Sequence, residues 1–234
     1  MQFKKNIPNF ITLLNLTSGV LGIVFLMRGD IREAVYMVFL AGLFDFLDGL
    51  AARALRAYSE IGKSLDSLAD IVSFGVLPGL LVFKTLEINN FTIDLLNNGL
   101  PWLAFFIPAF SAVRLAIFNN DPEQSTSFKG LPTPANAFLV VSAAYVYLSL
   151  PEAKQVHTAL LAAVVISGCN LMVSGLRMFS FKIKKDKKND LLRNVSFLIV
   201  AAFLIIFSGM AGVFLSIVLY IILSAFFHFI YRNS

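Results

Sequence analysis

Two pairs of aspartates lie close together in the first third of the chain, within strongly apolar sequence. Asp45 and Asp48 are three residues apart, and Asp66 and Asp70 are four residues apart. On a helix, either spacing places both carboxylates on one face. Charged groups inside membrane spans are costly and usually functional, and four converging carboxylates repel one another unless a cation neutralises them. The aspartates therefore predict a divalent-metal site, and oxygen ligands favour Mg²⁺, Mn²⁺ or Ca²⁺ over Zn²⁺.

The residues between the two pairs suit a phosphate group. Gly49 and Ala52 leave one helix face without bulk, so a nucleotide or diphosphate can approach the backbone closely. Arg53 and Arg56 supply planar guanidinium groups that bind phosphate oxygens, although arginines at such positions also serve as interfacial anchors. Gly62 relieves crowding before the next apolar segment. We therefore expect a metal-dependent diphosphate site.

The elements that hold these residues are expected to be membrane-spanning helices. Of the 234 residues, 58% are hydrophobic and 14% are charged, and the mean hydropathy is +0.79. Apolar runs of about 20 residues recur, and a helix of about 20 residues crosses the hydrocarbon core of a bilayer. The sequence predicts an all-α, polytopic helical bundle that forms a single membrane domain over residues 1–234. The eight expected spans are Ile7–Met27, Arg32–Arg53, Ser64–Phe83, Leu100–Asn120, Thr133–Leu150, Val156–Phe179, Leu192–Ser208 and Val213–Tyr231, with a tight helical hairpin at Met210–Gly212.

Basic residues are distributed unevenly between the two ends of these spans. With the N-terminus in the cytoplasm, only Arg28, Arg32, Lys84 and Lys154 face the other side, which leaves 15 of the 19 lysines and arginines inside. The positive-inside rule then predicts a multi-pass protein of the cell membrane with both termini cytoplasmic. The signature at 45–70 lies at the cytoplasmic ends of the second and third spans. The run Lys182–Lys188 predicts a loop beside anionic lipid headgroups rather than a nucleic-acid site.

Written out, the motif is Asp45-x2-Asp48-Gly49-x2-Ala52-Arg53-x8-Gly62-x3-Asp66-x3-Asp70, which resembles the signature of the CDP-alcohol phosphotransferase family at every position. Members of that family are helical membrane enzymes that move a substituted phosphate from a CDP-linked donor to an alcohol and release CMP. The resemblance implies that all four aspartates bind Mg²⁺ or Mn²⁺, that Asp70 deprotonates the acceptor hydroxyl, and that the protein is a homodimer. The implied nucleotide and diphosphate contacts are Thr12, Gly49, Ala52, Arg53, Gly62 and Asp66.

Further segments narrow the substrates. Asn6–Thr12, Leu65–Pro78, Arg114–Asn119 and Phe128–Pro134 look like the branch of the family that uses CDP-diacylglycerol and L-serine, although Ile117 stands where relatives often carry a second arginine. Serine carries a carboxylate, so its pocket needs a fixed cation, which Arg114 or Lys129 is placed to supply; Arg114 is also suited to anchor the span at the interface. The residues expected around serine or the lipid phosphate are Arg56, Ser73, Arg114, Asn119 and Lys129.

The expected reaction is an in-line displacement at the phosphorus that bears the diacylglycerol, with the serine hydroxyl attacking and CMP leaving. One alternative is a sister enzyme with glycerol 3-phosphate, inositol phosphate or another alcohol as acceptor, or with an archaeal-type lipid donor. A second alternative is a transporter or cation channel. Transporter sites tend to lie at the bilayer midplane between inverted repeats, whereas these aspartates lie near one face and the sequence shows no evident repeat.

Overall fold

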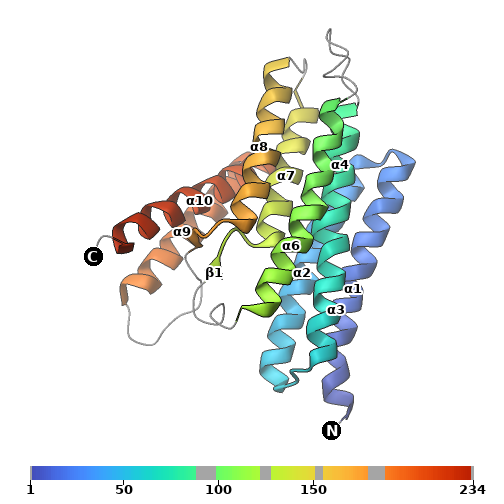
Figure 1. Ribbon diagram of the computed structural model, residues 1–234, viewed down its shortest axis with the longest axis vertical. Helices are drawn as coiled ribbons and strands as arrows, with labels where there is room; N and C mark the ends of the chain where they lie inside the picture. The colour runs from blue at the N-terminus through green and yellow to red at the C-terminus, as the bar shows by residue number, and fades with distance from the viewer. Residues whose placement is uncertain (1, 88–98, 122–127, 151–154, 179–187, 233–234) are drawn as a thin grey trace.

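The computed structural model describes residues 2–87, 99–121, 128–150, 155–178 and 188–232, and most of them are helical (Figure 1). Seven helical segments are long and apolar enough to cross a membrane, and the helix Thr133–Leu148 is shorter. The predicted polytopic, all-α architecture is therefore confirmed. The helices are α1 (Gln2–Arg28), α2 (Ile31–Leu55), α3 (Glu60–Asp70), the π-helix η1 (Ile71–Val76), α4 (Leu77–Glu87), the 3₁₀-helix η2 (Leu100–Phe105), α6 (Phe106–Asn120), α7 (Thr133–Leu148), α8 (Gln155–Val173), α9 (Lys188–Ser208) and α10 (Met210–Arg232).

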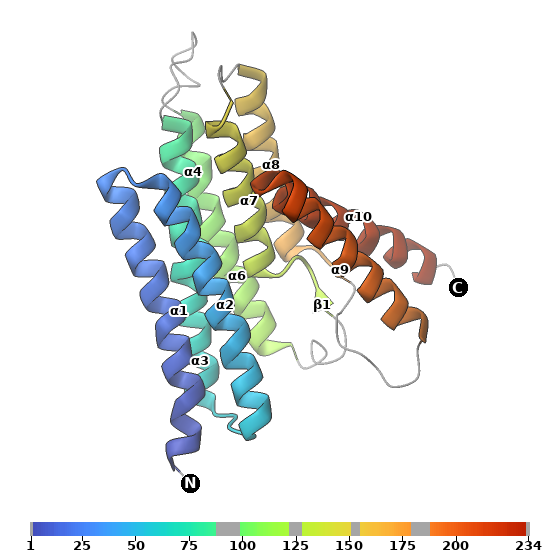
Figure 2. The same cartoon turned by 180° about the vertical axis from the view of Figure 1, so that it is seen from behind.

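Helices α1 to α8 stand side by side as a bundle, and α9 and α10 lean away from it in both views (Figures 1 and 2). Apolar residues such as Phe74, Leu77 and Val140 fill the bundle interior and are fully buried. Large apolar side chains such as Phe10, Phe46 and Ile206 are exposed on the outside. An apolar surface of this kind is stable in contact with lipid, as expected of a membrane protein.

Helix α1 packs closely against the continuous helical rod formed by α3, η1 and α4. A Cβ atom on Gly19 would lie 2.4 Å from Ser73 Oγ and 3.0 Å from Ser73 Cα, and one on Gly22 would lie 2.4 Å from Leu77 Cδ2. The absence of side chains at these two glycines therefore allows the helices to approach. This contact places the polar face of α1 beside the aspartates of α3.

The third span contains a π-helix directly after Asp70. Residues Ile71–Val76 adopt this wider helix between α3 and α4. Such segments are rare, and they frequently occur at functional sites because they change the direction of the side chains that follow. Here η1 turns Ser73 toward α1, where its hydroxyl donates a hydrogen bond to the backbone oxygen of Asn15 at 3.0 Å. Gly75 faces α6 instead, since a Cβ there would lie 3.3 Å from Ser111 Cβ.

Two details of the predicted spans are wrong. Helix α8 ends at Val173, and the residues expected to continue it form a turn and the strand β2 (Arg177–Met178), while Phe179 lies outside the described residues. Strand β2 pairs antiparallel with β1 (Phe128–Lys129), because the chain before α7 folds back onto the end of α8, where Leu131 N donates to Leu171 O at 2.9 Å. The hairpin between the last two spans turns at Gly209, which has a φ of +55°, so Met210–Gly212 already belong to α10.

Candidate active site

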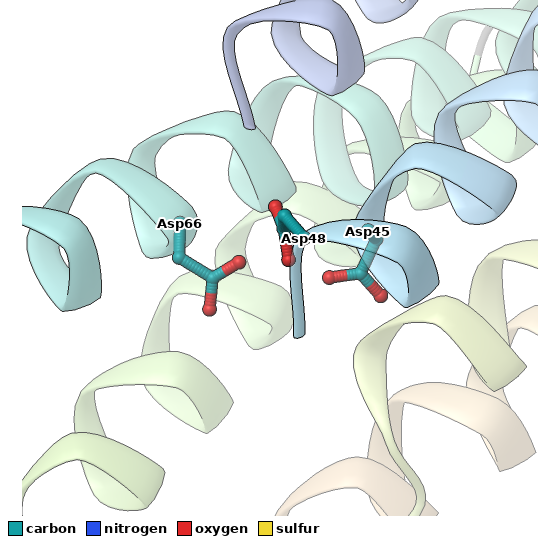
Figure 3. Close-up of side chains that lie close together, drawn as sticks. All are labelled: Asp45, Asp48 and Asp66. Carbon is teal, nitrogen blue, oxygen red and sulfur yellow. The ribbon is translucent and has the colours of Figure 1, made fainter. Parts of the chain in front are cut away.

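Three of the four aspartates meet between α2 and α3. Figure 3 shows Asp45 and Asp48 on α2 and Asp66 on α3, with their carboxylates directed toward the space between the two helices. One carboxylate oxygen from each residue lies within 4.8 Å of the others. The sequence prediction that the two pairs face each other is thus confirmed for these three residues.

The chemistry of this group suits a hard divalent cation. Asp48 is 7% exposed, and Asp45 and Asp66 are half-buried. Within the parts of the chain that the structure describes, no lysine or arginine forms an ion pair with any of the three. Negative charges gathered away from water are costly unless a cation offsets them, and carboxylate oxygens are the preferred ligands of Mg²⁺ and Mn²⁺. The group therefore fits a divalent metal ion.

Asp70 lies one helical turn beyond Asp66 and is 6% exposed. It does not belong to the group of three. Its Oδ1 atom instead accepts a hydrogen bond at 3.1 Å from Nδ2 of Asn15 on α1. Coordination of the metal by Asp70 stays a prediction, and so does its role as the base.

Helix α1 also holds Asp48 in place. The Thr12 hydroxyl donates to Asp48 Oδ2 at 2.7 Å, and both residues are buried. Hydrogen bonds from neighbouring residues fix the orientation of metal-binding carboxylates and thereby affect metal affinity. The predicted contact of Thr12 with nucleotide stays a prediction, and the contact that the structure shows orients an aspartate of the acidic group.

A cleft of about 610 Å³ opens beside this group, between α1, the end of α2 and the start of α3. All six residues predicted to contact the nucleotide and diphosphate line it: Thr12, Gly49, Ala52, Arg53, Gly62 and Asp66. The local backbone explains why they converge. Helix α2 ends at Leu55, and its C-cap residue Arg56 has a φ of +49°. Ser59 caps the start of α3, where its side chain accepts a hydrogen bond from Gly62 N at 3.0 Å. The short turn between the two helices forms the floor of the cleft.

The two predicted arginines of this segment differ in position. Arg53 lines the cleft, and its Nε donates to Gly49 O at 2.9 Å. Arg56 is exposed at the C-cap of α2 and is not among the residues that line the cleft. The left-handed backbone of Arg56 ends α2, so this residue does not continue the helix face that carries Gly49 and Arg53.

The residues predicted around serine are distributed over the C-cap of α2, η1, α6 and β1. Ser73 is fully buried against α1, as described above. Asn119 joins α6 to α3, because its side-chain Nδ2 donates to Ser67 Oγ at 2.8 Å and its backbone carbonyl oxygen accepts from Lys63 Nζ at 2.7 Å. Lys129 forms an ion pair with Asp121 at 3.7 Å. The hydrogen bonds of Ser73 and Asn119 thus join helices, and their contact with serine stays a prediction.

Among the residues predicted to bind the acceptor substrate, Arg114 has the most distinctive environment. It lies on α6 and is only 4% exposed, and its Nε atom is buried with no hydrogen-bond partner in the described part of the chain. Its guanidinium group lies over the ring of Phe118, with Cζ 5.3 Å from the ring centre. A buried cation without an anionic partner is costly. Arg114 is therefore suited to hold an anionic group of a substrate.

Sequence reasoning missed two residues of the site. Asn15 donates to Asp70, and Lys63 lines the cleft while it donates to the Asn119 carbonyl oxygen. Asn15 follows Thr12 by three residues, so both lie on the same face of α1. This spacing of polar residues in an apolar helix could have predicted that Asn15 faces the site. Lys63 gave no such signal, because a lysine beside a membrane span usually serves as a topological or interfacial residue.

The fold and the site define a class of protein: a polytopic helical membrane protein whose acidic group and adjoining cleft can bind a metal ion and a phosphate compound. Residues 5–169 match the family model described as CDP-alcohol phosphatidyltransferase. The chain belongs to this family, as the resemblance of its aspartate motif indicated.

Several curated relatives are similar to the chain. A CDP-diacylglycerol--serine O-phosphatidyltransferase of Bacillus subtilis is 33% identical over 75% of this chain and 91% of its own length. An enzyme with the same name in Mycobacterium leprae is 32% identical over 58% of this chain, although the match spans only 45% of that longer protein. An archaetidylserine synthase of Methanothermobacter thermautotrophicus is 33% identical over 58% of this chain and 56% of its own length.

Proposed function

We propose that this protein transfers the phosphatidyl group from CDP-diacylglycerol to L-serine and so produces phosphatidylserine and CMP. The observation that carries the proposal is the acidic group of Asp45, Asp48 and Asp66 beside a cleft that contains the rest of the family motif. The names of the relatives support serine as the acceptor, because bacterial and archaeal relatives share it while their lipid products differ.

Each part of the reaction has residues suited to it. Asp45, Asp48 and Asp66 would hold Mg²⁺ or Mn²⁺, which when bound offsets the charge of the diphosphate. Arg53 binds a phosphate oxygen of the donor, and Gly49 and Ala52 leave room for the nucleotide. The serine hydroxyl forms the new oxygen–phosphorus bond, its proton passes to Asp70, and the bond to CMP breaks. Positioning of the two substrates supplies much of the rate enhancement in such a displacement.

Arg114 binds the serine carboxylate in this proposal. Two contacts set its height in the bundle, since α6 runs antiparallel to α3 and η1. Ser111 lies against Gly75, and Asn119 lies against Ser67. Arg114 stands between these contacts and therefore lies near the level of Asp70. A carboxylate bound there brings the serine hydroxyl toward the base.

The proposed placement in the cell follows from the charge distribution. The excess of basic residues at one end of the spans favours a cell-membrane protein with the cleft and both termini in the cytoplasm. The run Lys182–Lys188, on which part of this argument depends, begins outside the described residues and only its last residue lies in α9. A homodimer stays a prediction from the family resemblance.

The purified protein tests the proposal directly. CMP release is measured with CDP-diacylglycerol and serine, glycerol 3-phosphate or inositol phosphate, each after treatment with EDTA and again after addition of Mg²⁺, Mn²⁺ or Zn²⁺. We expect serine-dependent release of CMP that EDTA abolishes and that Mg²⁺ or Mn²⁺ restores. Release with another alcohol but not with serine would assign the protein to a sister activity. Full turnover in EDTA would refute the metal site.

A further inference from the structure

Asn15 has an unusual hydrogen-bond arrangement. Its side chain is fully buried, its Nδ2 donates to Asp70 Oδ1 at 3.1 Å, and its buried Oδ1 atom has no hydrogen-bond partner among the residues that the structure describes. A carboxylate accepts hydrogen bonds and does not donate them. The amide nitrogen must therefore face Asp70, and rotation of the amide cannot relieve the unpaired oxygen.

The backbone of Asn15 is fixed as well. Its carbonyl oxygen accepts the hydrogen bond from Ser73 Oγ, and the glycine at position 19 allows α1 to remain close to η1 at this level. The side-chain amide oxygen Oδ1, by contrast, has no donor, and a buried oxygen without a donor destabilises a protein by an amount similar to that of a lost hydrogen bond. An arrangement that holds such an acceptor in one orientation beside the proposed base suggests that a substrate supplies the donor.

The acceptor substrate has the required donor. The ammonium group of serine lies on the carbon next to the one that carries the hydroxyl. A hydroxyl that approaches Asp70 therefore brings the ammonium close to the residue hydrogen-bonded to the same carboxylate, which is Asn15. Ser73 of η1 faces α1 and Gly75, two residues later, faces α6, so Arg114 on α6 lies on the other side of η1 from Asn15. The buried Nε atom of Arg114 also has no hydrogen-bond partner within the described ranges. An oxygen acceptor and a cation on opposite sides match the two charges of an amino acid.

We infer that Asn15 is a specificity-determining residue whose Oδ1 atom accepts a hydrogen bond from the ammonium group of the acceptor. The inference rests on the proposed function and deepens it, because it explains why an amino alcohol is preferred to a plain alcohol. It also gives Asn15 two roles, since its Nδ2 orients Asp70 for every acceptor while its Oδ1 distinguishes between acceptors.

The test compares serine with 3-hydroxypropanoate, which is serine without its amino group. For the wild type, we expect kcat/KM with serine to exceed that with 3-hydroxypropanoate by about 10-fold to 100-fold, the effect of a hydrogen bond to a charged group. In Asn15→Leu this ratio falls to about one. Loss of the bond to Asp70 lowers both rates and cancels in the ratio. Asn170→Leu removes an exposed amide that bonds only to its own helix, at Ile166 O, and keeps the wild-type ratio.

The outcomes separate the inference from the proposed function. A wild type that uses both compounds equally well overturns the inference while the proposed function stands, and this measurement does not require the variant to fold. An unchanged preference for serine in Asn15→Leu, with metal-dependent binding of CDP retained as evidence of folding, also overturns it. A wild type that transfers nothing to serine refutes the proposed function and the inference together.

Discussion

The contact between Thr12 and Asp48 gives a quantitative prediction about metal affinity. The Thr12 hydroxyl lies 2.7 Å from Asp48 Oδ2 and 3.0 Å from the backbone oxygen of Pro8, four residues earlier. Thr12→Val keeps the shape of the side chain and removes the donor. A hydrogen bond to a charged group contributes about 1.5 to 3 kcal/mol, which corresponds to about 10-fold to 100-fold in an equilibrium constant. Loss of a hydrogen-bond partner of a metal ligand typically lowers metal affinity to a similar extent.

The assay is a titration of CMP release with Mn²⁺ at saturating CDP-diacylglycerol and serine. We expect the concentration of Mn²⁺ at half-maximal rate to rise by about 10-fold or more in Thr12→Val and to return toward the wild-type value in Thr12→Ser. Thr17→Val is a matched control, because the Thr17 hydroxyl makes the same kind of local bond to Leu13 O at 2.7 Å and is exposed. Equal effects of Thr12→Val and Thr17→Val, or no effect of either, would refute the role of this contact.

Three further substitutions test other parts of the site. Asp70→Asn removes the proposed base but keeps its shape, so serine-dependent CMP release should fall by about 100-fold or more while CDP binding persists; full activity would reject the assignment. The lysine in Arg53→Lys cannot reproduce a bidentate phosphate contact, so the KM for CDP-diacylglycerol should rise. Arg28→Lys is the control, because Arg28 lies in the last turn of α1, far along that helix from the cleft residue Thr12, and it should leave this KM unchanged. Gly19→Ala places a Cβ atom against the backbone of Ser73 and should destabilise the protein by about 1 to 3 kcal/mol, with a lower melting temperature and lower activity. Gly99→Ala, whose Cβ atom meets no atom of the described residues within 4 Å, serves as its control; a wild-type melting temperature in Gly19→Ala would contradict the close packing of α1 and η1.

Predictions from sequence succeeded where one short segment contains the information. The spacing of Asp45, Asp48 and Asp66 on two consecutive helices requires that they meet once the helices pack antiparallel, and the structure brings them within 4.8 Å. The cleft residues Gly49, Ala52, Arg53 and Gly62 belong to the same two helices and the turn between them. Their proximity follows from a local hairpin and needs no knowledge of the rest of the bundle.

The acceptor side of the site depends on elements distant in sequence. Contact of Ser73 and Asn119 with serine stays a prediction, and their hydrogen bonds to Asn15 and Ser67, which join helices, were not foreseen. Hydropathy also predicted that the span of α8 continues beyond Val173, because a local apolar pattern cannot show that Arg177–Met178 pair with a distant strand. Such outcomes depend on packing partners that a local pattern does not specify.

The sequence by itself determined the membrane-spanning helices, the acidic motif and the set of residues from α2 and α3 that line the cleft, because helical periodicity fixes which side chains share a face. Only the tertiary structure decided how α1 joins the site, with Thr12 on Asp48 and Asn15 on Asp70. Those contacts arise where α1 packs against α2 and the end of α3, and the hydrogen bonds of a buried polar group depend on its three-dimensional neighbours rather than on its neighbours in the chain.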